Sequence, residues 1–344
     1  MKFQLAINME RTSDARDMRD EQRHNLEMVQ KADQSGFSTV WAAEHHALEM
    51  TIAPNPFQIL TWYAAHTDNI RLGTAVAVAP YWHPIRLAGE AAMADLYSGG
   101  RLEFGIGSGA YQREFDRMHN GLKQSEGWKY MAEMLPALQA LWKGDYEHDG
   151  EYWKFPTATS VPKPMQVDIP VWIAARAPVS FDMSVERGYN IMSWPLTRPM
   201  SEAELYKQHL DNSMAKFPGA IKPTFAMMRH TSVYDNAADG DASMKAIRAT
   251  LGRFANLFQN LGDVENGFPK PLSDEALAAF PDYNPNVLEQ NLMFGSPDMI
   301  IEKLKLYEAL GVDEFIYYAS MGLGHEEQKR SLDLFCNEVM PAFA

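Results

Sequence analysis

The sequence predicts an α/β fold, a (β/α)8 TIM barrel with insertions, and three observations support this. Short segments rich in β-branched and aromatic residues alternate with longer amphipathic segments, which is typical of βα units around a parallel sheet. Eight such strands can be counted along the chain. The 344 residues, 46% of them hydrophobic, exceed the roughly 250 of a typical barrel. We therefore expect one domain over residues 1–344, with inserted segments.

The predicted strands are short runs bounded by turn residues. In parallel βα units, each strand ends where a loop leads into the next helix, so residues after the strands share one face of the barrel. The eight predicted strands are residues 3–8, 39–42, 70–78, 101–106, 169–174, 190–193, 225–233 and 314–319.

Capping residues set the helix boundaries. Ser13 or Asp14 can cap the first helix, and Gly36 ends it. Ser296 before Pro297 is a helix start, because proline is favoured in the first turn. The predicted helices are residues 14–34, a helix that begins near Glu126, 180–187 and 297–310.

Two segments interrupt the βα rhythm. Residues 146–156 carry a hairpin signal, with Asp149-Gly150 at the turn, and are expected outside the barrel. Residues 260–293 are rich in Gly, Pro and Asn with weak periodicity, and an insertion of that length is often an active-site lid. We expect a mobile cover over the strand ends.

Composition narrows the class of partner. The net charge of −14 argues against nucleic acid. Cys336 is the single cysteine, so an intrachain disulfide and a thiolate metal cluster are both excluded. The first residues lack the apolar core of a signal peptide, and no apolar run approaches membrane-spanning length. We expect a soluble, cytoplasmic protein.

Glu44-His45-His46 directly follows the second predicted strand, where a barrel carries its active site. An imidazole can accept and return a proton near neutral pH. Because adjacent side chains on an extended segment point opposite ways, a two-histidine metal site is disfavoured and one ring should face the pocket. We predict that His45 is catalytic, that Glu44 orients the ring or the loop, and that His46 is structural. A histidine packed at a strand end is the alternative.

Further candidate segments follow later strands. Gly107-Ser108-Gly109 could hold a phosphate or could serve only as a tight turn. Arg176, with Ser180 at a helix start, forms a possible anion site, although Arg176 could instead pair with a carboxylate such as Glu186. Aromatic residues at two strand ends could line an apolar chamber or belong to the ordinary core. They lie in Tyr81-Trp82-His83-Pro84 and Met192-Ser193-Trp194-Pro195.

Over nearly the whole chain, the order and spacing of these motifs resemble the bacterial luciferase-like flavin monooxygenases. The resemblance rests on Trp41-Ala42-Ala43-Glu44-His45-His46, Asn55-Pro56, Leu72-Gly73-Thr74-Ala75-Val76, His83-Pro84, Gly100-Arg101, Phe104-Gly105-Ile106 and Val339-Met340-Pro341.

The resemblance assigns roles by position. His45 is similar to the family's catalytic histidine, and Ala75-Val76 to its non-prolyl cis peptide beneath the flavin ring. Glu114 resembles an acidic residue of the same site. The implied phosphate contacts are Ser108, Arg176, Ala177 and Ser180, and the implied contacts near the flavin ring are Met192, Ser193 and Trp194.

Two departures from the luciferase pattern matter. Gly107 stands where luciferase has a reactive cysteine, so no thiol can act there. Ser108 stands at an arginine position and Arg176 at a glutamate position. We hypothesise that the cation facing the phosphate has moved from the loop of Ser108 to the loop of Arg176.

The resemblance implies a two-component monooxygenase. A separate flavin reductase would supply reduced FMN as cosubstrate, and O2 would form a C4a-peroxyflavin that oxygenates a small, apolar organic substrate. A homodimer and no metal are expected. Three alternatives stay open: a deazaflavin-dependent hydride-transfer dehydrogenase, a metal-dependent hydrolase using His45, His66 and His83, and a non-catalytic flavin-binding protein. The substrate, the type of oxygenation and the reductase are not specified by the sequence.

Overall fold

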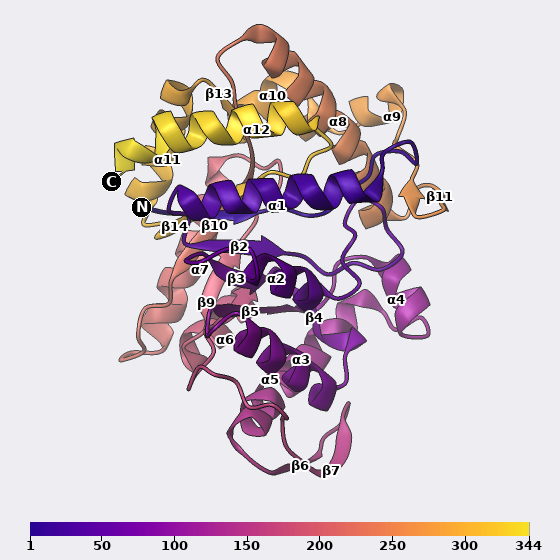
Figure 1. The fold of residues 1–344 in the computed structure, drawn as a ribbon, viewed down its shortest axis with the longest axis vertical. Coiled ribbons are helices and arrows are strands. Elements are labelled where there is room, and N and C mark those ends of the chain that lie inside the picture. The colour runs from indigo at the N-terminus through magenta and orange to yellow at the C-terminus, as the bar shows by residue number, and fades with distance from the viewer. Residues whose placement is uncertain (344) are drawn as a thin grey trace.

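Eight parallel strands close into a barrel surrounded by helices, as predicted (Figure 1). The computed structural model describes residues 1–343, apart from the side chain of Asp274, so residue 344 of the predicted domain lies outside the described residues. The strands follow in the order β1-β2-β3-β5-β8-β9-β10-β14, and β14 pairs with β1 to close the ring. They are β1 (Lys2–Ala6), β2 (Thr39–Ala42), β3 (Arg71–Thr74) with its continuation β4 (Ala77–Val78), β5 (Leu102–Gly107), β8 (Val171–Ala174), β9 (Asn190–Ser193), β10 (Phe225–Val233) and β14 (Glu314–Tyr318).

Helices follow the strands and cover the outside of the barrel. The first half of the chain contributes α1 (Met18–Gln34), α2 (Pro56–Ala64), α3 (Pro84–Tyr97), α4 (Gln112–Met118), α5 (Gly127–Lys143) and α6 (Pro178–Arg187). The second half contributes α7 (Met200–Lys216), α8 (Ala237–Gln259), α9 (Asp274–Ala278), α10 (Pro285–Asn291), α11 (Pro297–Leu310) and α12 (His325–Leu334). No helix within residues 1–343 is both long and apolar enough to cross a membrane.

The first helix begins later than predicted. It starts at Met18, with Asp17 rather than Ser13 or Asp14 as its cap, because the Asp17 side chain accepts a hydrogen bond from the amide of Arg19. The helix predicted over 180–187 starts at Pro178 and ends at Arg187. The cap at Ser296 is confirmed, since its side chain accepts from the amide of Met299.

The third predicted strand is divided in two. β3 ends at Thr74 and β4 begins at Ala77, and the bond between Ala75 and Val76 is a cis peptide, as the resemblance implied. Gly105 on the neighbouring β5 lets the two strands approach, because a Cβ there would lie 1.9 Å from the carbonyl oxygen of Thr74. Among the elements that were not predicted are α4, α12 and β13 (Met293–Gly295), which pairs with the end of β10.

Both insertions have defined structure. β6 (Tyr146–Asp149) and β7 (Lys154–Ala158) form the predicted hairpin, which extends from the lower end of the molecule in Figure 1. Residues 260–293 contain the hairpin β11 (Val264–Glu265) and β12 (Phe268–Pro269), then α9 and α10. The expectation of a long loop was therefore wrong in form, because short elements fill the segment.

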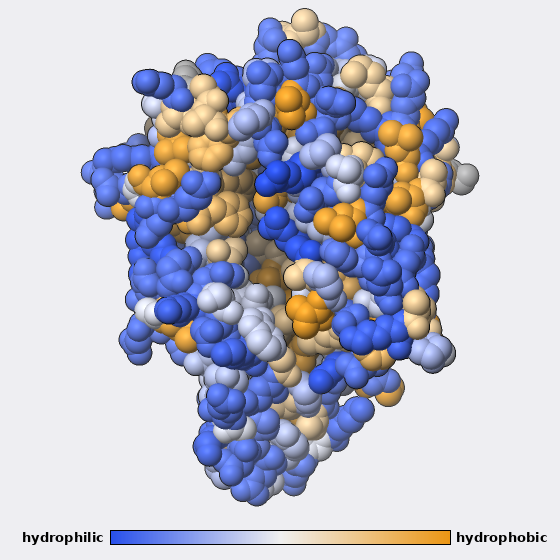
Figure 2. All heavy atoms as spheres, turned by 180° about the vertical axis from the view of Figure 1, so that it is seen from behind, coloured by the Kyte–Doolittle hydropathy of each residue, from blue (hydrophilic) through white to orange (hydrophobic). Residues whose placement is uncertain are grey.

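Three apolar clusters build the core. The largest lies between the strands and the surrounding helices. A second fills the inside of the barrel around Trp41, Trp172 and Tyr318. The third joins α8 to loops at the mouth of the barrel and includes Leu48 and Tyr111. The face opposite that of Figure 1 is hollowed near its centre, with apolar side chains deep in the hollow (Figure 2).

Candidate active site

The predicted site residues converge because their strands are neighbours. Ala42 of β2 pairs with Thr74 of β3, and Ile106 of β5 pairs with Ile173 of β8. Ala174 of β8 in turn pairs with Met192 of β9. The segments that follow these strands therefore lie side by side at the carboxyl end of the barrel, which we call the barrel mouth.

His45 is held at the barrel mouth by Glu114 of α4. The Nδ1 atom of His45 lies 2.9 Å from one carboxylate oxygen of Glu114, and the other oxygen accepts the amide of His46 at 2.6 Å. Because a carboxylate only accepts, Nδ1 carries the proton toward Glu114. The Nε2 atom of His45 makes no hydrogen bond to any described residue. This nitrogen is available to a ligand.

The charge around His45 favours its protonated form. Burial alone would lower the pKa of His45, but the charge and hydrogen bond of Glu114, with the charge of Glu44, raise this pKa above its ordinary value. The Glu114 side chain is only 2% exposed, so solvent screens the pair weakly. His45 is thus suited to give up a proton near neutral pH.

Glu44 organises the loops and does not contact the ring of His45. Its buried carboxylate accepts hydrogen bonds from Nε2 of His46 at 2.8 Å, the amide of Val78 at 2.7 Å and the indole of Trp82 at 2.8 Å. It therefore joins the loop after β2 to the segment that follows the cis peptide. His46 faces Glu44 and Tyr81, away from the pair that His45 forms with Glu114.

Val76 explains why position 107 has no side chain. A Cβ added to Gly107 would lie 2.4 Å from Cγ2 of Val76, far inside contact distance. The Val76 side chain thus lies against the backbone of β5 at Gly107. A cysteine at Gly107 could not fit without displacing Val76.

Aromatic and apolar side chains lie together between His45 and α8, and we call the region that they border the chamber. Its inner part brings Ala75, Val76, Met192, Trp194 and Tyr318 into one apolar cluster. A row of rings leads outward from it, with centroid distances of 4.9 Å from His45 to Tyr111, 4.9 Å from Tyr111 to Phe258, 6.2 Å from Phe258 to Phe254 and 6.0 Å from Phe254 to Trp194. The chamber wall is therefore continuous from His45 to Trp194.

Arg176, Ala177 and Ser180 lie at the start of α6, and Ser108 follows β5, the strand that pairs with β8. Ala177 is the N-cap of this helix and provides no side-chain cap, but the first turn has few free amide groups, because Pro178 has no amide hydrogen and the Ser180 amide donates to the carbonyl of Ala177 at 2.9 Å. Arg176 contacts the Tyr206 hydroxyl at 3.3 Å and is otherwise exposed. The hydroxyls of Ser108 and Ser180 donate to no described residue. The alternative pairing of Arg176 with Glu186 is not among its contacts.

Ser193 and the inserted segment complete the surroundings. The hydroxyl of Ser193 donates to the carbonyl of Ala175 at 2.7 Å, which ties the loops after β8 and β9 together. The carbonyls of Gly262 and Gly267 accept hydrogen bonds from the Arg113 side chain and the Glu49 amide. The inserted segment is therefore bound to α4 and to the loop that carries His45.

Several residues of the mouth escaped the sequence reasoning. Tyr111, Phe254 and Phe258 line the row of rings, and His230 of β10 stacks on Tyr318 at 4.5 Å. Burial lowers the pKa of His230 to about 3, so this imidazole is neutral at working pH. For Phe254 and Phe258, the only available signal was the apolar spacing on α8. That spacing predicts that these side chains are buried but does not say which residues they contact.

The histidines of the metal alternative do not converge. His66 bonds to the carbonyl of Trp62 on its own helix, and His83 caps α3. Within residues 1–343, no group of three or more His, Cys, Asp or Glu side chains is placed to hold a metal ion.

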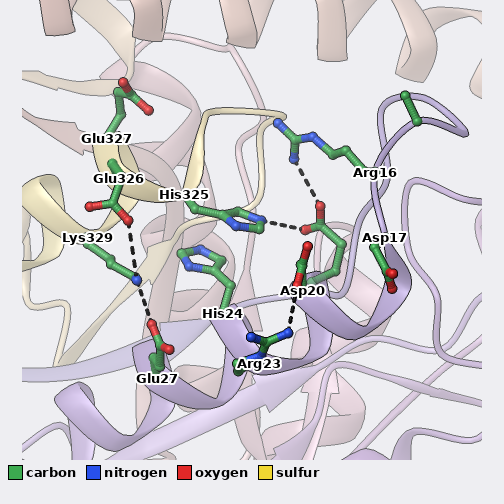
Figure 3. A pocket seen from close by; sticks show the side chains of 12 residues that line it. Arg16, Asp17, Asp20, Arg23, His24, Glu27, His325, Glu326, Glu327 and Lys329 are labelled. Atoms are coloured by element: carbon green, nitrogen blue, oxygen red, sulfur yellow. Dashed lines mark hydrogen bonds and ion pairs between the residues drawn. The ribbon is translucent and has the colours of Figure 1, made fainter.

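A second histidine cluster lies between α1 and α12 (Figure 3). The rings of His24 and His325 stack at 4.0 Å. Nε2 of His325 lies 2.9 Å from the carboxylate of Glu21, and Nε2 of His24 lies 2.9 Å from the amide oxygen of Gln328. Charged side chains surround this cleft of about 600 Å³.

Comparison with known proteins agrees with this geometry. Residues 1–314 match the family model of the luciferase-like monooxygenases. The chain is 41% identical over 345 residues to the oxygenase component of a flavin-dependent trigonelline monooxygenase from Acinetobacter baylyi, covering 100% of this chain and 96% of that protein. It is 28% identical over 243 residues to an alkanal monooxygenase alpha chain from Photorhabdus luminescens, covering 67% of this chain and 62% of that protein.

Solved structures agree on the fold. A monooxygenase from Streptomyces bottropensis superposes with a TM-score of 0.82 at 22% identity, covering 100% of both chains. The FMN complex of the oxygenating constituent of 3,6-diketocamphane monooxygenase from Pseudomonas putida gives 0.76 at 18% identity, covering 99% of this chain and 98% of that chain. With the family match over most of its length, the chain belongs to the luciferase-like monooxygenases.

Proposed function

We propose that this protein is the oxygenase component of a two-component system that uses reduced FMN and O2 to oxygenate a small organic substrate. One observation carries the proposal: a histidine held by the buried Glu114, which helps to raise the pKa of the ring, follows β2 at the barrel mouth, and the cis peptide of Ala75 and Val76 follows the neighbouring β3. The relative from Acinetobacter is named as flavin-dependent, and the structure of the diketocamphane monooxygenase is an FMN complex. A deazaflavin dehydrogenase is less well supported, because the F420-dependent neighbours are 17% identical and share only the fold.

The residues at the barrel mouth fit FMN. A phosphate would be held by the start of α6, the guanidinium of Arg176 and the free hydroxyls of Ser108 and Ser180. Ala75, Val76, Met192, Ser193 and Trp194 would bound the ring system. When bound, reduced flavin supplies the electrons that activate O2.

The chain's own residues then have distinct roles. Glu114 orients His45 and stabilises its positive charge, and Nε2 of His45 exchanges a proton with the substrate or the reacting oxygen. Glu44 fixes the cis-peptide loop and His46. We propose that residues 260–293 act as a lid that keeps water out of the chamber.

The chamber favours a planar substrate. Its wall consists of the rings of Tyr111, Phe254, Phe258 and Trp194, which suit stacking against a flat ring. The relative from Acinetobacter acts on trigonelline. We therefore propose a small ring compound as substrate, whose ring portion occupies the apolar part of the chamber.

We propose that the protein is a cytoplasmic homodimer served by a separate flavin reductase. Large apolar side chains are exposed on α2 and α3, namely Trp62, Met93, Leu96 and Tyr97, with Tyr97 62% exposed. Such a patch is typical of an interface. Sedimentation equilibrium should show a dimer of the wild-type chain and a monomer after Leu96→Glu with Tyr97→Lys. A monomeric wild type would refute the homodimer.

The oxygenase proposal is tested by anaerobic loading with reduced FMN followed by mixing with aerated buffer and trigonelline. Wild-type protein should give an oxygenated product containing label from 18O2. Flavin oxidation that yields only hydrogen peroxide with trigonelline and other ring compounds would contradict the proposal, as would oxygen-independent turnover.

A further inference from the structure

Arg253 of α8 is a half-buried cation without a partner. It makes no hydrogen bond or ion pair with any residue that the structure describes. The charges that act on it are those of Glu10 and Arg16, neither in contact with it. Most half-buried arginines in proteins are paired, since desolvating a guanidinium is costly. Its free donors thus point to an acceptor that the chain does not supply.

Arg253 opens into a cleft of about 380 Å³ between the loop after β1 and the inserted hairpin β11–β12. The hydroxyls of Thr12 and Ser13 line one side, and neither is bonded within the described chain. Phe268, Pro269 and Pro271 also line the cleft, and the guanidinium of Arg11 lies over the Phe268 ring at 5.5 Å. The cleft therefore brings together the guanidinium of Arg253, two hydroxyls and apolar side chains.

The remaining charges of the cleft leave Arg253 as its available cation. Lys270 pairs with Glu265 at 3.4 Å, so these two charges offset each other. Asp14 is exposed to solvent. Burial raises the pKa of Glu10 to about 7, so this carboxyl group is partly neutral at working pH. A negatively charged ligand at Arg253 would thus experience only weak electrostatic repulsion from the cleft.

The cleft adjoins the chamber of the barrel mouth. Phe254, the next residue along α8, packs on Trp194. Thr12 lies against Gly322, whose amide donates to Glu10 at 2.7 Å. Glu10 in turn acts electrostatically on Tyr318 of the chamber wall. The cleft at Arg253 is therefore connected to the chamber wall through Phe254 and through the contacts of Thr12, Gly322 and Glu10.

We propose that Arg253 captures the carboxylate of a small aromatic acid on its way into the chamber. A guanidinium pairs with a carboxylate through two parallel hydrogen bonds, and the cleft volume suits a single ring. The aromatic ring would rest on Pro269 and Pro271, next to the Phe268 ring that Arg11 covers. The inference deepens the proposed function, on which it rests for the chamber, by giving the substrate a negative charge at one end.

Isothermal titration calorimetry of the FMN-loaded protein with nicotinate and nicotinamide tests this proposal, because the two probes differ mainly in charge. Nicotinate should bind at least about tenfold more tightly than nicotinamide. Arg253→Gln should weaken nicotinate at least about tenfold and leave nicotinamide unchanged, whereas Arg253→Lys should give an intermediate value. Arg117→Gln, which removes an exposed arginine of α4, is the matched control and should change neither.

Equal affinity of the two probes, binding of neither, or full nicotinate binding by Arg253→Gln would overturn the proposal. Thermal melting of each variant confirms that it is folded. The oxidation of bound reduced FMN by O2 should be unchanged in Arg253→Gln. If the wild-type protein gives no labelled product while nicotinate binding still depends on Arg253, the oxygenase proposal fails and the anion site stands.

Discussion

His45 and His325 each lie 2.9 Å from a buried glutamate, the first at the barrel mouth and the second in the cleft between α1 and α12. At the mouth, Glu114 occupies only one ring nitrogen, and the ring adjoins the chamber wall. In the cleft, His325 stacks on His24, whose own Nε2 is taken by Gln328. Each of these two histidines thus has one ring nitrogen bonded to a glutamate, and they differ in surroundings, because His45 stacks on Tyr111 at the barrel mouth and His325 stacks on His24.

The two clusters also differ in charge. Glu114 helps to raise the pKa of His45, whereas burial lowers the pKa of His24 to about 4. His45 is therefore prepared to give up a proton near neutral pH, and His24 remains neutral and serves packing. The comparison predicts that changes at the mouth alter catalysis and that changes in the cleft alter stability.

Replacing His45 has the largest expected effect. His45→Asn should lower the yield of oxygenated product at least about 100-fold, because proton transfer by a positioned imidazole contributes that much or more. Reduced-FMN affinity should change less than threefold, measured by anaerobic fluorescence titration. His325→Asn, which removes a histidine with the same contact to glutamate, is the control and should keep wild-type yield. Equal losses in yield and in flavin affinity for His45→Asn would argue for a structural role.

Acid should destabilise the folded protein through His24 in the cleft between α1 and α12. Because the folded pKa of His24 lies below its unfolded value of 6.5, the unfolded chain binds the extra proton, and the stabilisation present above pH 6.5 is lost as the pH falls toward 4. The loss can reach about 3 kcal/mol. The free energy of unfolding, measured in urea from pH 7 to pH 4.5, should show this decline. The decline should be smaller in His24→Gln. An equally steep decline in His24→Gln would show that other groups dominate.

Removing Arg176 should have the smallest of these effects. Arg176→Ala deletes one charge-assisted contact to the phosphate, so the Kd of reduced FMN should rise about tenfold. Arg187→Ala, at the far end of α6, is the matched control and should bind normally. An unchanged Kd in Arg176→Ala would mean that Arg176 is not the cationic partner of the phosphate, and the hypothesis that this cation has moved from position 108 to the loop of Arg176 would be wrong.

The barrel was predictable because eight strands repeat one strong pattern, and the site motifs follow those strands directly. The partner of His45 was not deducible from spacing, since Glu114 lies 69 positions away on a short helix that the pattern did not reveal. Glu44 was expected to orient the ring or the loop, and its bonds to His46 and Val78 emerge only in three dimensions. The stacked pair of His24 and His325 likewise joins opposite ends of the chain.

The pH profile of product yield per reduced FMN, compared between wild type and Glu114→Gln, tests the central claim most directly. If His45 gives up a proton under the influence of Glu114, yield declines as the pH rises through the pKa of His45. Glu114→Gln lowers that pKa, so the decline should move to lower pH and the maximal yield should fall about tenfold. Glu21→Gln, the equivalent change in the α1–α12 cleft, should leave the profile in place. A profile that Glu114→Gln does not move would contradict the account.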